Sequence, residues 1–113
     1  MKVSFEGAGE QVLSFMKASG VEKGSLVKLS ANATVAKCAA GDNFAGVCIK
    51  ADDSFADVKT AGYVELGYTG TAPAVGYAKL AAAGDGNVKT ADTGREHLVI
   101  NVDSTAAVVG FIM

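Results

Sequence analysis

The chain is poor in the residues on which most metal and catalytic sites depend. Its 113 residues include one histidine, two cysteines, one proline and no tryptophan, against 14 glycines. A zinc site normally needs three or four soft or imidazole ligands, and neither Cys38 nor Cys48 has a histidine or a further cysteine near it in the sequence. The sequence therefore predicts no metal site. Reduced, buried thiols are the favoured interpretation, and a disulfide across a hairpin is the alternative.

Charge of one sign and long apolar runs are also lacking. The formal net charge is −2, and the ten basic residues are scattered singly along the chain. A surface that follows a phosphate backbone needs clustered lysine and arginine, so we expect no nucleic-acid partner. No apolar run is long enough to span a bilayer, and the first residues lack the apolar core of a signal peptide. We therefore expect no membrane partner and a soluble protein made in a cytoplasm.

The residues that could perform acid–base or nucleophilic chemistry do not form a recognisable constellation. His97 has no serine or cysteine nucleophile motif around it, so it is expected to be a surface or hydrogen-bonded residue. Asp52, Asp53 and Asp85 occur in turn-like stretches, where aspartate caps the backbone. The glycine-rich residues 84–86 do not precede a phosphate-binding helix. The sequence therefore predicts no catalytic residue, no cofactor and no enzymatic activity.

Short apolar runs are what the sequence does contain. They recur roughly every ten residues, and each ends at glycine, asparagine or aspartate, which is the pattern of an all-β sandwich or barrel. No stretch shows the full apolar stripe of an amphipathic helix. We therefore predict an all-β, single-domain β-barrel or β-tulip-like sandwich over residues 1–113, with little or no helix.

The second part of the chain repeats the order of the first. Residues 76–80 resemble residues 24–29 with one residue deleted, and residues 87–89 resemble residues 34–37. Gly94 then stands where Gly41 stood. Two similar halves packed together would remove exposed strand edges. The sequence thus predicts two similar halves, at 20–70 and 71–113, after an N-terminal strand or arm at 1–19.

Several of these segments also resemble a known family. Residues 21–29 read VEKGSLVKL, residues 40–47 read AGDNFAGV, and residues 62–66 and 76–80 read GYVEL and GYAKL. Over roughly residues 10–113 this order is similar to that of the capsid cement, or head decoration, proteins of phages and prophages. The resemblance implies a non-enzymatic structural protein of the virion. It would sit as a homotrimer on the capsid exterior, bound to the major capsid protein, and would brace neighbouring capsomers.

The resemblance does not extend to the N-terminus. Lambdoid relatives often carry a longer, proline-rich arm that adds a strand to a capsid subunit, whereas residues 1–19 here are short and contain no proline. Four apolar residues, Val3, Phe5, Phe15 and Met16, are the candidates for an oligomer or capsid interface. Burial of Phe5 and Phe15 in the core is the alternative for those two. The alternative function is a carbohydrate- or ligand-binding β-barrel module of a phage tail or surface protein.

Overall fold

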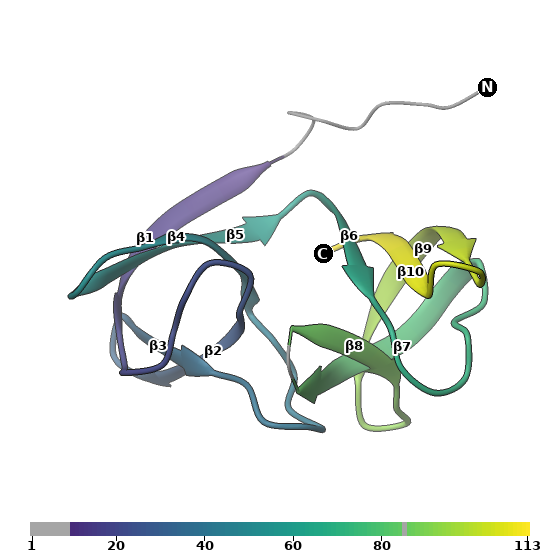
Figure 1. The fold of residues 1–113 in the computed structure, drawn as a ribbon, viewed down its shortest axis with the longest axis horizontal. Helices are drawn as coiled ribbons and strands as arrows, with labels where there is room; N and C mark the ends of the chain where they lie inside the picture. The colour runs from purple at the N-terminus through teal and green to yellow at the C-terminus, as the bar shows by residue number, and fades with distance from the viewer. Residues whose placement is uncertain (1–9, 85) are drawn as a thin grey trace.

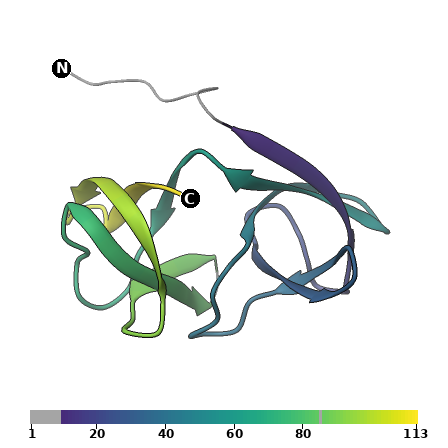
Figure 2. The ribbon, with the colours of Figure 1, turned by 180° about the vertical axis from the view of Figure 1, so that it is seen from behind.

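The computed structural model describes residues 10–84 and 86–113, and these form ten strands with no helix (Figure 1). The all-β prediction is thereby confirmed. Figures 1 and 2 show the first five strands side by side with the last five. The strands are β1 (Gln11–Lys17), β2 (Leu26–Ala31), β3 (Thr34–Lys37), β4 (Gly46–Ala51), β5 (Phe55–Ala61), β6 (Tyr63–Gly67), β7 (Gly76–Gly84), β8 (Asn87–Thr90), β9 (Arg95–Asp103) and β10 (Val108–Ile112).

The first five strands form a closed barrel with the order β1-β3-β2-β4-β5. β1 closes it by pairing with β5 in the antiparallel sense and with β3 in the parallel sense. The interior is filled mostly by small β-branched side chains, which suit a narrow barrel. The buried residues of this interior are Val21, Val27, Val35, Cys48, Ala56 and Val58.

The last five strands form a second sheet with the order β6-β10-β9-β7-β8. A parallel bridge between Tyr68, just after β6, and Val88 of β8 brings the two edges of this sheet together. The backbone N–H of Thr69 donates to the carbonyl of Val88 over 3.0 Å at the same place. The second sheet is therefore curled toward the same closed form as the first barrel.

The two halves share one topology, because β6 to β10 repeat the pairings of β1 to β5 in the same order. The agreement extends to individual residue pairs in the hairpins β2–β3 and β7–β8. Leu29 pairs with Val35 and is followed by a bulge, and Ala82 pairs with Val88 and is followed by a bulge. A bulge is a specific local feature, so its recurrence supports internal duplication. The prediction of two similar halves is confirmed.

The residue-level correspondence differs from the one read from the sequence. Sequence similarity set Leu80 opposite Leu29, but the hairpin registers align Leu80 with Val27 and Ala82 with Leu29. The error arose because β7 and β9 pair over five residues, whereas β2 and β4 pair over two. β7 and β9 therefore contain more paired residues than β2 and β4. This shifts the apolar residues of β7 along the chain relative to those of β2.

The positions of β1 and β6 also differ from the sequence-based division. β1, expected in a separate strand or arm at 1–19, is a wall of the first barrel. β6, expected in the half at 20–70, pairs with β10 in the second sheet. The change from one half to the other therefore falls between β5 and β6, at Gly62, whose φ of +112° turns the chain sharply.

A second apolar core joins the halves into one packed body. Leu26, Cys38, Phe44 and Val47 from the first half pack with buried residues of the second, among them Phe111. The second sheet thus completes its core with side chains that the first half supplies. In the described part of the chain, no helix is long and apolar enough to cross a membrane.

Candidate interaction surface

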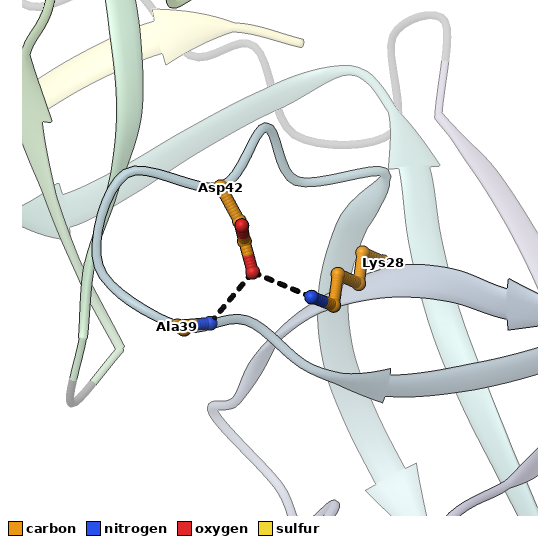
Figure 3. A network of polar contacts seen from close by, with 3 residues as sticks. All are labelled: Lys28, Ala39 and Asp42. Atoms are coloured by element: carbon orange, nitrogen blue, oxygen red, sulfur yellow. Dashed lines mark hydrogen bonds and ion pairs between the residues drawn. The ribbon is translucent and has the colours of Figure 1, made fainter.

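Residues 39–45 lie between β3 and β4 and connect the two halves of the molecule. We call this segment the clamp. Figure 3 shows how it is held at its base. One carboxylate oxygen of Asp42 accepts a hydrogen bond from the backbone N–H of Ala39 over 2.9 Å and pairs with the Lys28 ammonium at 2.7 Å. The Lys28 ammonium and the Ala39 N–H lower the pKa of Asp42, and Asp42 raises the pKa of Lys28. Asp42 thus closes the segment into a fixed turn.

The clamp reaches the second half through backbone and side-chain hydrogen bonds. The N–H of Gly41 donates to the carbonyl of Ala82, and the N–H of Ala82 donates to the carbonyl of Asp42, both over 2.8 Å. The Asn43 side chain donates to the carbonyl of Thr93 and accepts from the N–H of Arg95. Ala82 lies on a part of β7 that extends past the end of its ladder with β9. The clamp therefore covers an otherwise open edge of β7.

Phe44 carries the apolar part of this contact. Its ring stacks on the ring of His97, with centroids 5.1 Å apart and planes 5° from parallel, and both rings meet the edge of Phe111. His97 is buried and its Nδ1 lies 3.3 Å from the carbonyl oxygen of Ile112, so Nδ1 carries the proton of that hydrogen bond. Burial lowers the pKa of His97. His97 therefore has a packing role at the junction of the halves.

The predicted interface residues fall into three groups. Val3 and Phe5 lie outside the described residues. Phe15 packs against the interior of the first barrel, as the alternative interpretation expected. Met16 is 48% exposed and lies directly across the strand pair from Phe55, which is 53% exposed. Only Met16 of the described candidates is thus available at the surface.

The first half carries more exposed apolar surface than the sequence indicated. Among the described residues eight large apolar side chains are exposed, and six of them belong to the first half: Val12, Leu13, Met16, Leu29, Ile49 and Phe55. Val12, Met16 and Phe55 share the outer face of β1 and β5, which we call the outer patch. Sequence analysis missed Phe55 because it follows the turn at Asp52 and Asp53. In the sequence, only the two-residue alternation along β1 pointed to the outer patch, because it places Val12 on the same face of the strand as Met16.

The second half exposes Val75 and Tyr77, at 70% and 74%. Tyr77 pairs with Leu98, which in turn pairs with Ile112 of β10. The hydroxyl of Tyr63 donates to Glu65, whose carboxylate together with burial raises the pKa of that phenol. Among the aromatic side chains of the described second half, Tyr77 has the largest exposed fraction.

The residues considered for metal or acid–base chemistry are separated. No group of three or more histidine, cysteine or acidic side chains in the described ranges could hold a metal ion. Asp52 accepts hydrogen bonds from the N–H groups of Ser54 and Phe55, which lower its pKa, and Asp103 caps the equivalent turn of the second half. Cys38 and Cys48 are free, buried and in different cores, and burial raises the pKa of Cys38 to about 11.

Comparison with known proteins found no match. No family model matches the sequence, and no curated protein or solved structure is significantly similar to it.

Proposed function

We propose that the protein is a non-enzymatic capsid decoration protein, which binds the outside of a phage capsid as a homotrimer and stabilises the shell. The observation that carries the proposal is the outer patch. Met16 and Phe55 lie directly opposite each other on the outer face of β1 and β5, and Val12 lies on the same face beyond the hydrogen-bonded pair Ser14 and Asp57. Exposed apolar side chains gathered on one face of a barrel can serve as a contact for a protein partner, and on this proposal the partner is the major capsid protein.

The resemblance of residues 21–29 and 40–47 to cement proteins supports the same function. In the structure these residues include the first part of β2, most of the clamp and the start of β4, and the clamp holds the halves together through its hydrogen bonds. A rigid subunit loses little conformational freedom on binding. A trimer that contacts several capsomers at once gains affinity through effective concentration, so each outer patch needs only a modest contact.

The test measures binding of the protein to purified expanded capsids by co-sedimentation. Replacing Met16 and Phe55 together by glutamate places charge on the outer patch, and we expect binding to fall by at least about a hundredfold. Val75→Glu is the control, because Val75 is also apolar and is more exposed than Met16 and Phe55, but lies on the second half. Wild-type protein that fails to bind expanded capsids, or a double variant that binds as well as wild type, contradicts the proposal.

A carbohydrate-binding module is the second candidate, and the exposure of Tyr77 is the observation that favours it. Aromatic faces stack on sugar rings, so this function requires an accessible ring. Tyr77→Ala separates the two functions. It leaves capsid binding unchanged on the decoration proposal, whereas specific binding to a glycan array that Tyr77→Ala abolishes would support the module instead.

A further inference from the structure

The chain passes from the first half to the second through a single residue, Gly62. β5 ends at Ala61 and β6 begins at Tyr63, so one residue separates a strand of the first barrel from a strand of the second sheet (Figure 1). The φ of Gly62 is +112°, which turns the chain from one half toward the other. With Gly62 extended like the residues on either side of it, β5 and β6 would continue as one strand and carry the halves apart.

The turn at Gly62 is held by contacts on both sides of it. The Lys59 ammonium donates to the carbonyl of Tyr63 over 2.7 Å and lies 3.4 Å from a carboxylate oxygen of Glu10. The N–H of Met113 donates to the carbonyl of Gly62 over 3.0 Å. A Cβ on Gly62 would lie 3.1 to 3.3 Å from atoms of Glu10 and Lys59, and its φ would strain any other side chain. The closed turn therefore requires glycine.

The contact between the halves is made away from this connection. Phe44 of the clamp is 5% exposed and packs on His97 and Phe111, and the N–H of Gly41 donates to the carbonyl of Ala82. The second half of another copy presents the same residues in the same arrangement. A clamp would therefore bind the second half of another copy through contacts identical to those that it makes in its own chain.

The two halves also differ in what they lose when they separate. In the described part of the chain the interior of the first barrel is made of first-half residues, so that interior stays covered. The second sheet loses Leu26, Phe44 and Val47, which pack in its core. Apolar surface exposed in this way is unfavourable in water. A separated second half therefore binds a first half, either its own or that of another copy.

We propose that two copies of this chain exchange their second halves when Gly62 straightens, and so form a dimer in which each clamp holds the second half of the other copy. The occupant of the clamp is the surface that already lies there within one chain, supplied by a second chain. Exchange is reciprocal, so both clamps are filled and the assembly closes at two copies. Because the outer patch takes no part in this contact, exchange is independent of the capsid proposal.

The connection at Gly62 decides between the monomer and the exchanged dimer. Inside one chain the halves are held close together, and this high effective concentration favours the monomer. A short connection that is strained in the closed form favours exchange. Exchange also requires the clamp to open and expose Phe44. We therefore expect wild type to be monomeric when dilute and to form a dimer when it refolds from urea at high concentration.

The first test replaces Gly62 by valine, which prefers extended backbone and is strained in the closed turn. We expect Gly62→Val, refolded from urea, to dimerise with an association constant at least about tenfold above that of wild type, measured by sedimentation equilibrium. Gly20→Val is the matched control, because Gly20 has a φ of +92° but lies in the first half with open space around it. Gly62→Val that associates no more strongly than wild type or Gly20→Val overturns the proposal.

Lengthening the connection should have the opposite effect. A short glycine–serine segment inserted after position 62 is flexible, so it lets the two halves of one chain meet without the strained turn. We expect this insertion to return Gly62→Val to the monomer. A dimer that persists after the insertion would mean that the copies associate through some other surface, and it would contradict exchange.

Disulfide trapping identifies the contact in the dimer. The Asn43 side chain donates to the carbonyl of Thr93 over 3.2 Å between the halves. Chains with Asn43→Cys and chains with Thr93→Cys are refolded together at high concentration under reducing conditions and then mildly oxidised. We expect a covalent heterodimer, because exchange brings position 43 of one copy to position 93 of the other. Cys38 and Cys48 are buried in the folded protein, so they add little background.

The control in this experiment is Ser104→Cys in place of Thr93→Cys. Ser104 is also exposed, but it follows the other end of β9 from the clamp contact. A heterodimer yield that is no higher with Thr93→Cys than with Ser104→Cys overturns the proposal. Since this experiment keeps Gly62, it decides the question even if Gly62→Val does not fold.

Discussion

At the residue scale, His97 links the packing of the two halves to pH. The ring is buried between Phe44 and Phe111, and Arg95 adds to the effect of burial in lowering its pKa. The unfolded chain therefore takes up the proton at a higher pH than the folded chain does. Stability is highest above the unfolded pKa of about 6.5, and it falls as the pH decreases toward the folded pKa.

We expect the urea midpoint of wild type to decrease between pH 7.5 and pH 5.5, and His97→Phe to remove most of this decrease. Phenylalanine keeps an aromatic ring beside Phe44 but cannot take up a proton. The measurement is urea unfolding followed by tyrosine fluorescence at several pH values. An equal slope in the variant would show that another group causes the dependence.

Asp42 gives a second prediction at this scale, with a different pH window. Its pKa is lowered in the folded protein by Lys28 and by the N–H of Ala39. A carboxylate of this kind stabilises the fold above its unfolded pKa, and the stabilisation is lost as the pH falls through the lower folded value.

We expect Asp42→Asn to lower the melting temperature at pH 7, and the difference from wild type to close at a pH below the ordinary value of 3.8. Asp53→Asn, at an exposed residue of another turn, is the control. A difference that persists unchanged at pH 2 would mean that the charge of Asp42 does not act through this network.

At the scale of elements, the clamp holds the second sheet through one large side chain. Phe44 is 5% exposed and stacks on a residue of β9. We expect Phe44→Ala to destabilise the protein by about 3–5 kcal/mol, the usual cost of removing a buried aromatic ring. Hydrogen exchange should show β7 to β10 losing more protection than the strands of the first barrel. Uniform loss over both halves would contradict the separate role of the clamp.

The elements also show what could be predicted from sequence. The all-β class followed from short runs with a period of two and from turn residues, because both are local properties. The motif at residues 40–47, which contains most of the clamp, could be recognised in the sequence, yet the contact of the clamp with Ala82 depends on where the β7–β9 ladder ends. The exposure of Phe55 and the partial burial of Phe15 depend on which side of a strand the barrel closes, and no local pattern determines that.

At the scale of the whole molecule, the two halves depend on each other unequally. In the described part of the chain, the apolar interior of the first barrel is made of first-half residues, whereas the second sheet packs on Leu26, Phe44 and Val47 of the first half. We expect a fragment of residues 10–62 to show a cooperative thermal transition and a fragment of residues 63–113 to show none. Circular dichroism measures both. A folded 63–113 fragment would show that the second half needs no help.

The clamp also has a consequence for the order of events during synthesis. The strands of the first barrel emerge from the ribosome before β7 does, and domains generally fold as their residues emerge. Asp42 and Lys28 can then close the clamp before its target on β7 has emerged. The first half can thus fold first and provide the apolar surface on which the second half packs, as an intramolecular chaperone would.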